Sequence, residues 1–404
     1  MHIGIDVSPA NRKHRTGTEW YTFYLVAELA KMDKENRYTL YVNRFPAQDL
    51  QEIIKDSPNF SIKILGWPFS LLWGMVRLSL EMIFNPPDVL FVPANALPLY
   101  FPRHTVTTVH DVAFLRDWQV YRKGADIDSR FKQRVLDAFI RVISAGRYRF
   151  NRLDYLAWST GRALHRAKKI IAVSEFTRQE ILHFYPKTRP NKVEVIYNGY
   201  SRELFRPIED QEKIGAVLAK YGLPSPYFLY VGRLEKKKNT PLLIESFAYY
   251  RENNPQAEES LVLIGNASYG YDEVKYAIEE FNLNRQVLMP GWVEEADIPY
   301  VFNGAKAFIF PTKHEGFGIP VIEAMACGLP VIASDLPVLR EVAGEAAMYF
   351  DYSSKEPIAQ AMTELSRDGA LRERLKRAGL ERAAQFSWEK CARSTLNLLE
   401  ETRR

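Results

Sequence analysis

Short runs of β-forming residues alternate with longer helical patterns from one end of the chain to the other. In the first half the predicted strands are His2–Val7, Tyr38–Val42, Val89–Val92, Val106–Val109, Ile170–Val173 and Val193–Ile196. In the second half they are Tyr227–Val231, Leu261–Ile264, Val287–Met289, Ala307–Phe310, Val331–Ala333 and Ala347–Phe350. This alternation is typical of parallel sheets joined by crossover helices, and the near-continuous apolar runs indicate strands that are covered on both faces. We therefore predict an α/β fold with two Rossmann-like, doubly wound domains.

The length of 404 residues is more than one hydrophobic core usually serves. Strand signals stop in the stretch from Tyr200 to Pro207, and a new helix-then-strand pattern starts near Glu209. We place an N-terminal domain at 1–204, a C-terminal domain at 205–387 and a final helix at 388–404. The apolar residues of that helix recur at helical spacing, so we expect it to pack back on the first domain.

Targeting and redox signals are few. The chain begins with the strand-like MHIGIDV, which does not resemble a secretory signal. The most apolar segment, 64–84, is interrupted by a proline and two charged residues, so no transmembrane helix is predicted. The two cysteines, Cys327 and Cys391, have no disulfide framework or metal-ligand spacing around them. We expect a cytoplasmic protein without structural zinc.

Charge is distributed unevenly along the chain. Residues 1–204 contain 30 Lys and Arg against 20 Asp and Glu, a net charge of +10, whereas residues 205–404 contain 24 against 29, a net charge of −5. Eleven of the basic residues lie between Arg130 and Lys169, interleaved with aromatic residues. This composition suits an anionic surface, but solvated helix faces have it too.

A glycine-containing loop follows the predicted strand Ala307–Phe310 and leads into a helix near Pro320. The loop contains Glu315, and Glu323 follows eight residues later, about one turn inside the helix. Ligands of open α/β sheets bind at the carboxyl ends of strands, where glycines allow close approach and a helix N-terminus favours phosphate. The first carboxylate could bind sugar hydroxyls and the second a ribose diol. The alternative is two solvated helix carboxylates.

A basic turn follows the predicted strand Tyr227–Val231. Gly232 and Arg233 come first, and a run of lysines ends at Lys238. An arginine, a lysine and the following helix N-terminus can converge on a diphosphate. The sequence does not settle which lysine takes part, and an isolated turn of this kind would be ordinary basic surface.

A histidine stands at the end of the predicted strand Val106–Val109. A lone histidine at a strand end is often a packed structural residue, and His110 could be one. Asp111, which follows it, could orient the imidazole or cap the next turn.

Together these segments resemble the family 4 glycosyltransferases, retaining enzymes with the two-domain GT-B fold and two glutamates separated by seven residues. The likeness runs from near residue 1 to about 390 and is strong in 227–345. It implies catalytic roles for His110, Arg233, Lys238 and Glu315, and donor binding by Gly17, Gly232, Val293, Gly316, Phe317, Gly318 and Glu323. The family often has a Gly-Gly pair after the first strand, whereas this chain has only Gly17. The basic residues of this loop, Arg12 and Arg15 among them, could face the donor phosphates or the acceptor, or they could be solvated.

The resemblance implies transfer of a hexosyl unit, with retention, from a nucleotide-diphosphate sugar to a saccharide or lipid-linked saccharide. The C-terminal domain would bind the nucleotide-sugar donor, and the acceptor would enter from the N-terminal domain across a cleft. No nucleophile is paired with a base, so we expect front-face attack in which the departing phosphate deprotonates the acceptor hydroxyl. Likeness to mannosyltransferases favours GDP-mannose over UDP-hexoses.

No metal or further cofactor is expected. The triplet Asp126-Ile127-Asp128 resembles the metal-binding DxD of GT-A glycosyltransferases, but it precedes the helical pattern 129–141. Carboxylates at a helix N-terminus are the simpler explanation. The alternatives to a transferase are another GT-B enzyme, such as a sugar-nucleotide epimerase or a sugar phosphorylase, and a non-catalytic nucleotide-sugar-binding protein. No nucleic-acid-binding module is recognised.

Peripheral contact with an anionic membrane is a further expectation, at the inner face of the cell membrane. In the helix candidate 69–84, Ser70, Gly74, Arg77 and Glu81 form one narrow polar stripe beside a wide apolar surface. That surface could pack against the sheet. If exposed, it could instead act with the basic segment on lipid.

Overall fold

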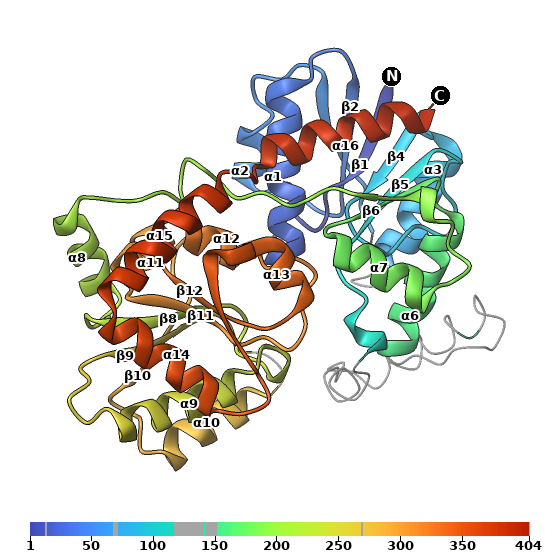
Figure 1. Cartoon of the computed structure of the whole chain (residues 1–404). Helices are drawn as coiled ribbons and strands as arrows, with labels where there is room; N and C mark the ends of the chain where they lie inside the picture. The colour runs from blue at the N-terminus through green and yellow to red at the C-terminus, as the bar shows by residue number, and fades with distance from the viewer. Residues whose placement is uncertain (13, 68–71, 117–140, 142–151, 268–269, 404) are drawn as a thin grey trace. The chain divides into compact units, whose positions relative to one another are not determined.

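The computed structural model describes residues 1–12, 14–67, 72–116, 141, 152–267 and 270–403. Its contacts divide the chain into two compact units, which are coloured along the chain in Figure 1. Unit 1 comprises Met1–Gly199 and Trp388–Arg404, and unit 2 comprises Tyr200–Ser387. The triplet at 126–128 and most of the basic segment from residue 130 lie outside the described residues.

Unit 1 is built on a seven-stranded parallel sheet in the order β3-β2-β1-β4-β5-β6-β7. Its strands are β1 (His2–Asp6), β2 (Arg37–Val42), β3 (Phe60–Ile64), β4 (Val89–Val92), β5 (Thr105–Val109), β6 (Lys169–Ala172) and β7 (Val193–Val195). Every residue of the central strands β4 and β5 is buried, as strands covered on both faces should be. The predicted doubly wound architecture is confirmed.

The edge strand β3 was absent from the sequence prediction. Its residues FSIKI pair in register with β2, yet only Phe60 is buried. An edge strand with a lysine and little apolar alternation gives a weak sequence signal.

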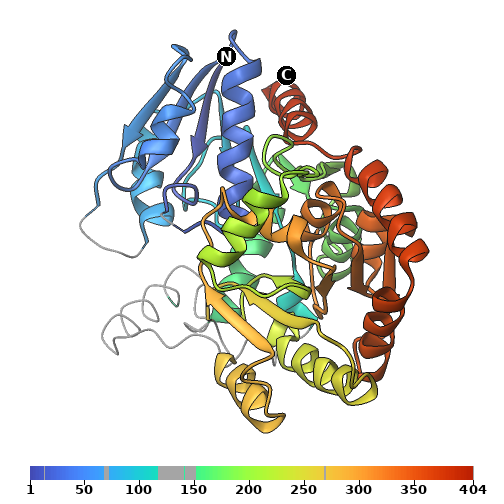
Figure 2. The same cartoon turned by 90° about the vertical axis from the view of Figure 1, so that its left-hand side faces the viewer.

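The described helices of unit 1 are α1 (Gly17–Met32), α2 (Gln48–Glu52), α3 (Leu78–Phe84), α6 (Arg152–Arg166), α7 (Glu175–Phe184) and α16 (Trp388–Arg403), and a π-helical turn, Trp73–Arg77, precedes α3. The α1 helix covers one face of the sheet (Figure 2). The C-terminal α16 packs against α1, β4 and β5, which confirms its predicted return to the first domain. Its Trp388 ring stacks on Tyr24 with the ring centroids 5.6 Å apart.

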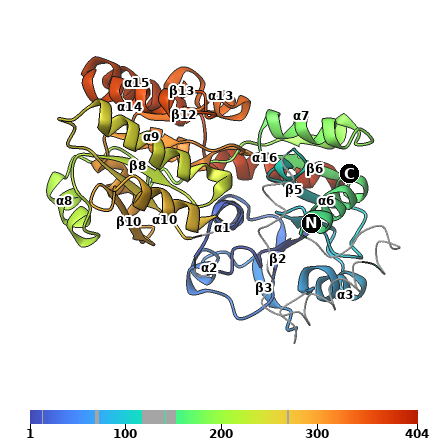
Figure 3. The ribbon, with the colours of Figure 1, turned by 90° about the horizontal axis from the view of Figure 1, so that it is seen from below.

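Unit 2 contains a six-stranded parallel sheet in the order β10-β9-β8-β11-β12-β13. The strands are β8 (Tyr227–Val231), β9 (Ser260–Ile264), β10 (Val287–Gly291), β11 (Ala307–Phe310), β12 (Val331–Ser334) and β13 (Ala347–Phe350). The helices are α8 (Gln211–Lys220), α9 (Thr240–Asn253), α10 (Tyr271–Glu280), α11 (Ile298–Gly304), α12 (Ile319–Ala326), α13 (Pro337–Ala343), α14 (Glu356–Arg367) and α15 (Gly369–Ala383). In Figure 3, α14 and α15 lie along one side of the unit and α10 along the other.

The apolar segment before β4 divides its residues between the core and solvent. Leu78 and Met82 of α3 are fully buried in the core of unit 1. Glu81, on the predicted polar stripe, is buried and paired with Lys63 and Arg77. Within the described residues, no helix is both long enough and apolar enough to cross a membrane.

Candidate functional site

The Gly232-Arg233 turn leaves the carboxyl end of β8 and is held by backbone bonds to the neighbouring strand β9. The amide of Gly232 donates to the carbonyl of Ile264 at 2.9 Å. The Tyr230 hydroxyl donates to the carbonyl of Arg233, also at 2.9 Å. Burial raises the pKa of Tyr230, so this hydroxyl keeps its proton. The Arg233 side chain is 46% exposed, and its guanidinium lies 3.6 Å from the Glu235 carboxylate.

Lys238 and Glu315 come together from two loops at the carboxyl edge of the unit 2 sheet. Their side chains form an ion pair and are only 14% and 15% exposed. A backbone bond from the Lys313 amide to the Lys237 carbonyl, 3.2 Å long, ties the two loops to each other. Lys236 points elsewhere and pairs with Glu273 at 3.0 Å. Of these two lysines, the structure thus places Lys238 beside the glutamate loop.

A largely desolvated pair of this kind is sensitive to the loss of either partner. Removing one charge leaves the other buried and uncompensated, which costs about 3–5 kcal/mol in proteins. An anionic ligand that reaches Lys238 would replace part of its interaction with Glu315. The freed carboxylate oxygens of Glu315 could then accept hydrogen bonds from hydroxyl groups.

The glycine loop after β11 ends at the N-terminus of α12. Gly318 takes the left-handed conformation with φ of 95°, and a Cβ atom there would lie 3.0 Å from Leu339. Pro320 occupies the first turn of α12, as predicted. Phe317 is buried, and its ring meets Phe386 edge to face at a centroid distance of 5.6 Å. The packed Phe317 thereby anchors Gly316 and Gly318, so the loop backbone is positioned before any ligand arrives.

Glu323 lies on α12 and is partly buried. Burial, with a smaller contribution from the nearby Glu295, raises its pKa to about 8. Glu295 and the buried Val293 belong to the loop that follows β10. A carboxyl group that stays protonated near neutral pH can both donate and accept a hydrogen bond. This suits a diol, which also has donors and acceptors.

The raised pKa of Glu323 predicts a specific pH dependence of stability. Between its ordinary value of 4.5 and about 8, the unfolded chain loses this proton and the folded chain keeps it. Stability should therefore fall as pH rises through that window and level off above it. We expect the Glu323→Gln variant to lose this dependence, which amounts to about 4 kcal/mol between pH 5 and pH 9. Urea unfolding at a series of pH values measures this dependence of the unfolding free energy.

Glu381→Gln is the matched control, because Glu381 is an exposed glutamate on α15 of the same unit. Its stability curve should run parallel to that of the wild type. If the Glu323→Gln curve also runs parallel, Glu323 ionises normally and the assignment of its pKa is wrong.

His110, in unit 1, follows β5 directly. Its Nε2 lies 3.0 Å from the carbonyl oxygen of Pro93, and its ring meets Tyr21 edge to face at 4.9 Å. Because a carbonyl only accepts, Nε2 must carry the proton, and in the neutral ring Nδ1 is then an acceptor. Burial lowers the pKa of His110, which favours the neutral ring at pH 7. Asp111 accepts a bond from the Ala113 amide at 3.2 Å and so caps the next turn.

Gly17 begins α1 and is exposed, with open space around the position of a Cβ atom. The basic residues of its loop do not all behave as expected. Arg12 is exposed and pairs with Glu19 at 3.1 Å. Arg15 is neither solvated nor available to a ligand, because it is buried and pairs with Asp49. Among the described residues, no group of three His, Cys, Asp or Glu side chains could hold a metal ion.

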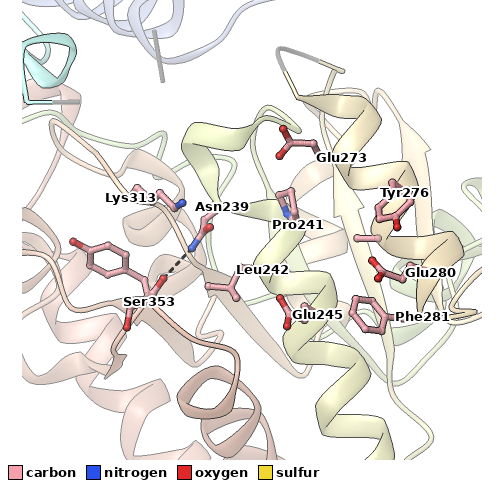
Figure 4. Close-up of a pocket in the computed structure, with 12 residues that line it drawn as sticks. Asn239, Pro241, Leu242, Glu245, Glu273, Tyr276, Glu280, Phe281, Lys313 and Ser353 are labelled. Carbon is pink, nitrogen blue, oxygen red and sulfur yellow. Dashed lines mark hydrogen bonds between the residues drawn. The ribbon is translucent and has the colours of Figure 1, made fainter. Parts of the chain in front are cut away.

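A surface hollow of about 770 Å³ lies beside the lysine turn in unit 2 (Figure 4). Asn239 and Lys313 line it, and the Asn239 amide donates to the Tyr352 carbonyl at 3.2 Å. Arg233, Lys238, Glu315 and Glu323 do not line it. The hollow therefore borders the candidate donor site without being part of it.

The structure adds residues that the sequence interpretation did not include. Gly265 follows β9, and its backbone lies directly against Gly232. Tyr230 supports Arg233 from inside the unit, and Glu295 acts on Glu323. The glycine after an apolar strand was a detectable turn signal. The pairing of strands that brings these residues together was not detectable.

Family comparisons match both halves of the chain. Residues 15–204 match Glycosyltransferase Family 4, and residues 216–382 match Glycosyl transferases group 1. The O-antigen chain mannosyltransferase B of Escherichia coli is 31% identical over 250 residues, which are 61% of this chain and 64% of that protein. The chain thus spans less than two thirds of the length of this curated relative.

Solved structures share the fold over nearly the whole chain. Sucrose-phosphate synthase from Thermosynechococcus elongatus has a TM-score of 0.73 at 18% identity, covering 99% of this chain and 98% of that one. The Anabaena protein HepE, solved in complex with UDP and glucose, has a TM-score of 0.70 at 16% identity, covering 99% of both chains. At these identities the likeness establishes the fold alone.

Proposed function

The chain belongs to the group 1 and family 4 glycosyltransferases, and on that premise we propose that it transfers a hexosyl unit from a nucleotide-diphosphate sugar to a saccharide or lipid-linked saccharide, with retention of anomeric configuration. The observation that carries the proposal is the pairing of Lys238 with Glu315 at the carboxyl edge of the unit 2 sheet, where the half-exposed Arg233 follows β8, the strand paired with β11. The two cations, Arg233 and Lys238, suit the diphosphate of a nucleotide sugar, and the Glu315 carboxylate suits the hydroxyls of its sugar.

Departure of the nucleotide diphosphate is the difficult step, because negative charge grows on its leaving oxygen. Arg233, Lys238 and the N-terminus of α12 stabilise that charge, and no metal ion is needed for this electrostatic work. Glu315 positions the sugar by accepting bonds from its hydroxyls. The neutral His110 offers Nδ1 to a sugar hydroxyl. The acceptor attacks from the face that the phosphate leaves, and the departing phosphate takes the proton of the acceptor hydroxyl.

Mannose is the sugar we propose first. The mannosyltransferase of Escherichia coli, at 31% identity, supports it. HepE, whose structure holds UDP and glucose, keeps UDP-hexoses as the alternative donors. The proposed process is the synthesis of a cell-surface polysaccharide or glycolipid at the cytoplasmic side of the membrane.

The donor can be identified by thermal shift, because a ligand that binds only the folded protein raises its apparent stability. We expect GDP-mannose to raise the melting temperature more than UDP-glucose, UDP-galactose or UDP-N-acetylglucosamine does. With mannotriose as a trial acceptor, release of the nucleoside diphosphate should increase and should persist in EDTA. Release that needs no acceptor would indicate an epimerase or hydrolase. Loss in EDTA with rescue by Mn²⁺ would reject metal independence.

Membrane contact is part of the proposal and rests on the outer face of α3. Leu80, Ile83 and Phe84 fall at positions i, i+3 and i+4, and they are 40%, 51% and 76% exposed. Exposed Tyr100 adjoins this face, because its amide binds the Ser79 hydroxyl on α3. A cluster of this kind on a unit with positive net charge fits insertion into an anionic bilayer.

Liposome co-sedimentation tests this contact. We expect binding to vesicles with phosphatidylglycerol, weaker binding to neutral phosphatidylcholine and release at high salt, because exposed charges are screened. Phe84→Ser should weaken binding at least threefold, since it removes the most exposed apolar side chain of the patch. Phe45→Ser is the matched control at 75% exposure. Equal partitioning to both vesicle types, or none, would reject the electrostatic part and favour a soluble acceptor.

A further inference from the structure

A second hollow, of about 780 Å³, opens on unit 1 alone. It lies where the loops after β1 and β2 meet the short helix α2. Its lining residues are Asn11, Arg12, Phe23, Arg44, Phe45, Ala47, Gln48, Asp49, Glu52 and Ile53. The volume falls in the range of roughly 300–1,000 Å³ that is usual for small-molecule sites.

One buried asparagine joins the two loops. The Asn11 amide donates to the carbonyl oxygens of Arg44 and Phe45 at 3.3 and 3.2 Å, and its own oxygen accepts from the Ala47 amide at 2.8 Å. Arg44 donates back to the carbonyl of Asn11 at 2.9 Å. The loop that carries Phe45 is therefore fixed by four bonds to the loop after β1.

The buried Arg15 connects two residues that line the hollow, Asp49 and Phe23. Its guanidinium pairs with both carboxylate oxygens of Asp49 and donates to the carbonyl of Ala10 at 2.6 Å. It also lies over the Phe23 ring at 4.3 Å from the centroid. These contacts connect α1, α2 and the first loop, so the hollow exists without a ligand. A pre-formed site loses less entropy when it binds.

Phe45 is 75% exposed despite this firm anchoring. A single exposed aromatic ring means little by itself. Here the ring stands on the wall of a hollow whose other exposed groups, Arg12, Arg44, Gln48 and Glu52, are planar and hydrogen bonding. With Asp49 included, the lining contains two arginines and two carboxylates, so it has no excess of formal charge. An aromatic face with planar donors and acceptors suits a neutral ligand rich in hydroxyl groups.

We propose that this hollow is a saccharide-binding subsite in which a neutral hexopyranose unit of the acceptor stacks on the Phe45 ring. The assignment to the acceptor rests on the proposed transferase function. The stacking site itself does not depend on it, because it can bind a sugar without turnover. Phe45 is then a specificity-determining residue, selecting acceptors with a sugar ring at this position.

Saturation-transfer NMR and calorimetry test the site with mannotriose, maltotriose, cellotriose and N-acetylchitotriose as probes. We expect at least one probe to bind the wild type with its ring protons saturated. Phe45→Ala and Phe45→Leu should weaken that binding about three- to tenfold, because each loses the flat aromatic face. Phe45→Trp should keep or improve it, whereas a merely apolar contact would be kept by leucine. Melting temperatures of all variants verify that they fold.

Tyr276→Ala is the matched control, because Tyr276 is an exposed aromatic residue of unit 2 and lies outside this hollow. It should leave probe binding unchanged. The subsite is overturned if no probe binds, if Phe45→Ala binds as the wild type does, or if leucine and tryptophan behave alike. Donor-induced stabilisation reports separately on the transferase proposal, so its failure is distinguishable from failure of the subsite.

Discussion

Replacement of Arg233 by alanine is expected to reduce kcat/KM by about 100-fold or more. A charge-assisted contact to the leaving diphosphate strengthens as charge develops, so its loss raises the barrier more than it weakens ground-state binding. The fall should therefore appear mainly in kcat. Arg233→Lys should recover only part of the rate, because lysine lacks the forked guanidinium that binds two oxygens at once. Steady-state kinetics with the donor found by thermal shift measures both variants.

The protein should remain folded in these variants, since the turn is held by the backbone of Gly232 and by the Tyr230 hydroxyl. Neither bond uses the Arg233 side chain. Arg340→Ala is the matched control: Arg340 is 52% exposed and pairs with Asp335 in the same unit. It should leave kcat/KM within a factor of two or so of the wild type, as surface ion pairs contribute little. Near-normal turnover of Arg233→Ala would remove Arg233 from the site.

The fold was largely predictable because strands buried on both faces of a parallel sheet appear in the sequence as nearly continuous apolar runs. β8, β11 and β13 begin and end where the sequence indicated. The failure at β3 has a physical cause, because an exposed edge strand does not need apolar residues. The surroundings of α3 were left open by the sequence, since its apolar surface could pack against the sheet or face solvent. Glu81 is buried and pairs with Arg77, one helical turn earlier, and with Lys63 of the edge strand β3; only Lys63 is contributed by tertiary structure.

The candidate site was predictable as a set of segments but not as an arrangement. Three adjacent lysines leave the choice among them open in the sequence, and only the pairing of two distant loops places Lys238 at Glu315. The same holds for Glu323, whose raised pKa depends on burial and on Glu295. In the sequence, Arg15 was a candidate for ligand contact. In the structure it is buried and paired with Asp49 of α2, a partner that the sequence does not indicate. Residue types indicate chemistry, whereas ionisation and availability depend on neighbours.

The largest structural effect is expected from Gly265→Ala, at a residue that touches no ligand. Gly265 has φ of 146°, and a Cβ atom there would lie 1.9 Å from the carbonyl oxygen of Gly232. The strands β8 and β9 must separate at their carboxyl ends to relieve this overlap, because backbone atoms cannot rotate away. We expect a loss of about 3 kcal/mol or more in unfolding free energy. The displaced Gly232-Arg233 turn should also cost about 100-fold in kcat/KM.

Gly215→Ala is the matched control in the same unit, since Gly215 lies within α8 and a Cβ atom there meets only open space. Alanine favours a helix over glycine, so this variant should gain up to about 1 kcal/mol and keep full activity. Urea unfolding and steady-state kinetics measured on both variants separate the overlap from any general effect of adding a methyl group. If Gly265→Ala is as stable and as active as the wild type, the close contact between the two strand ends does not exist. The position of Arg233 would then need another explanation.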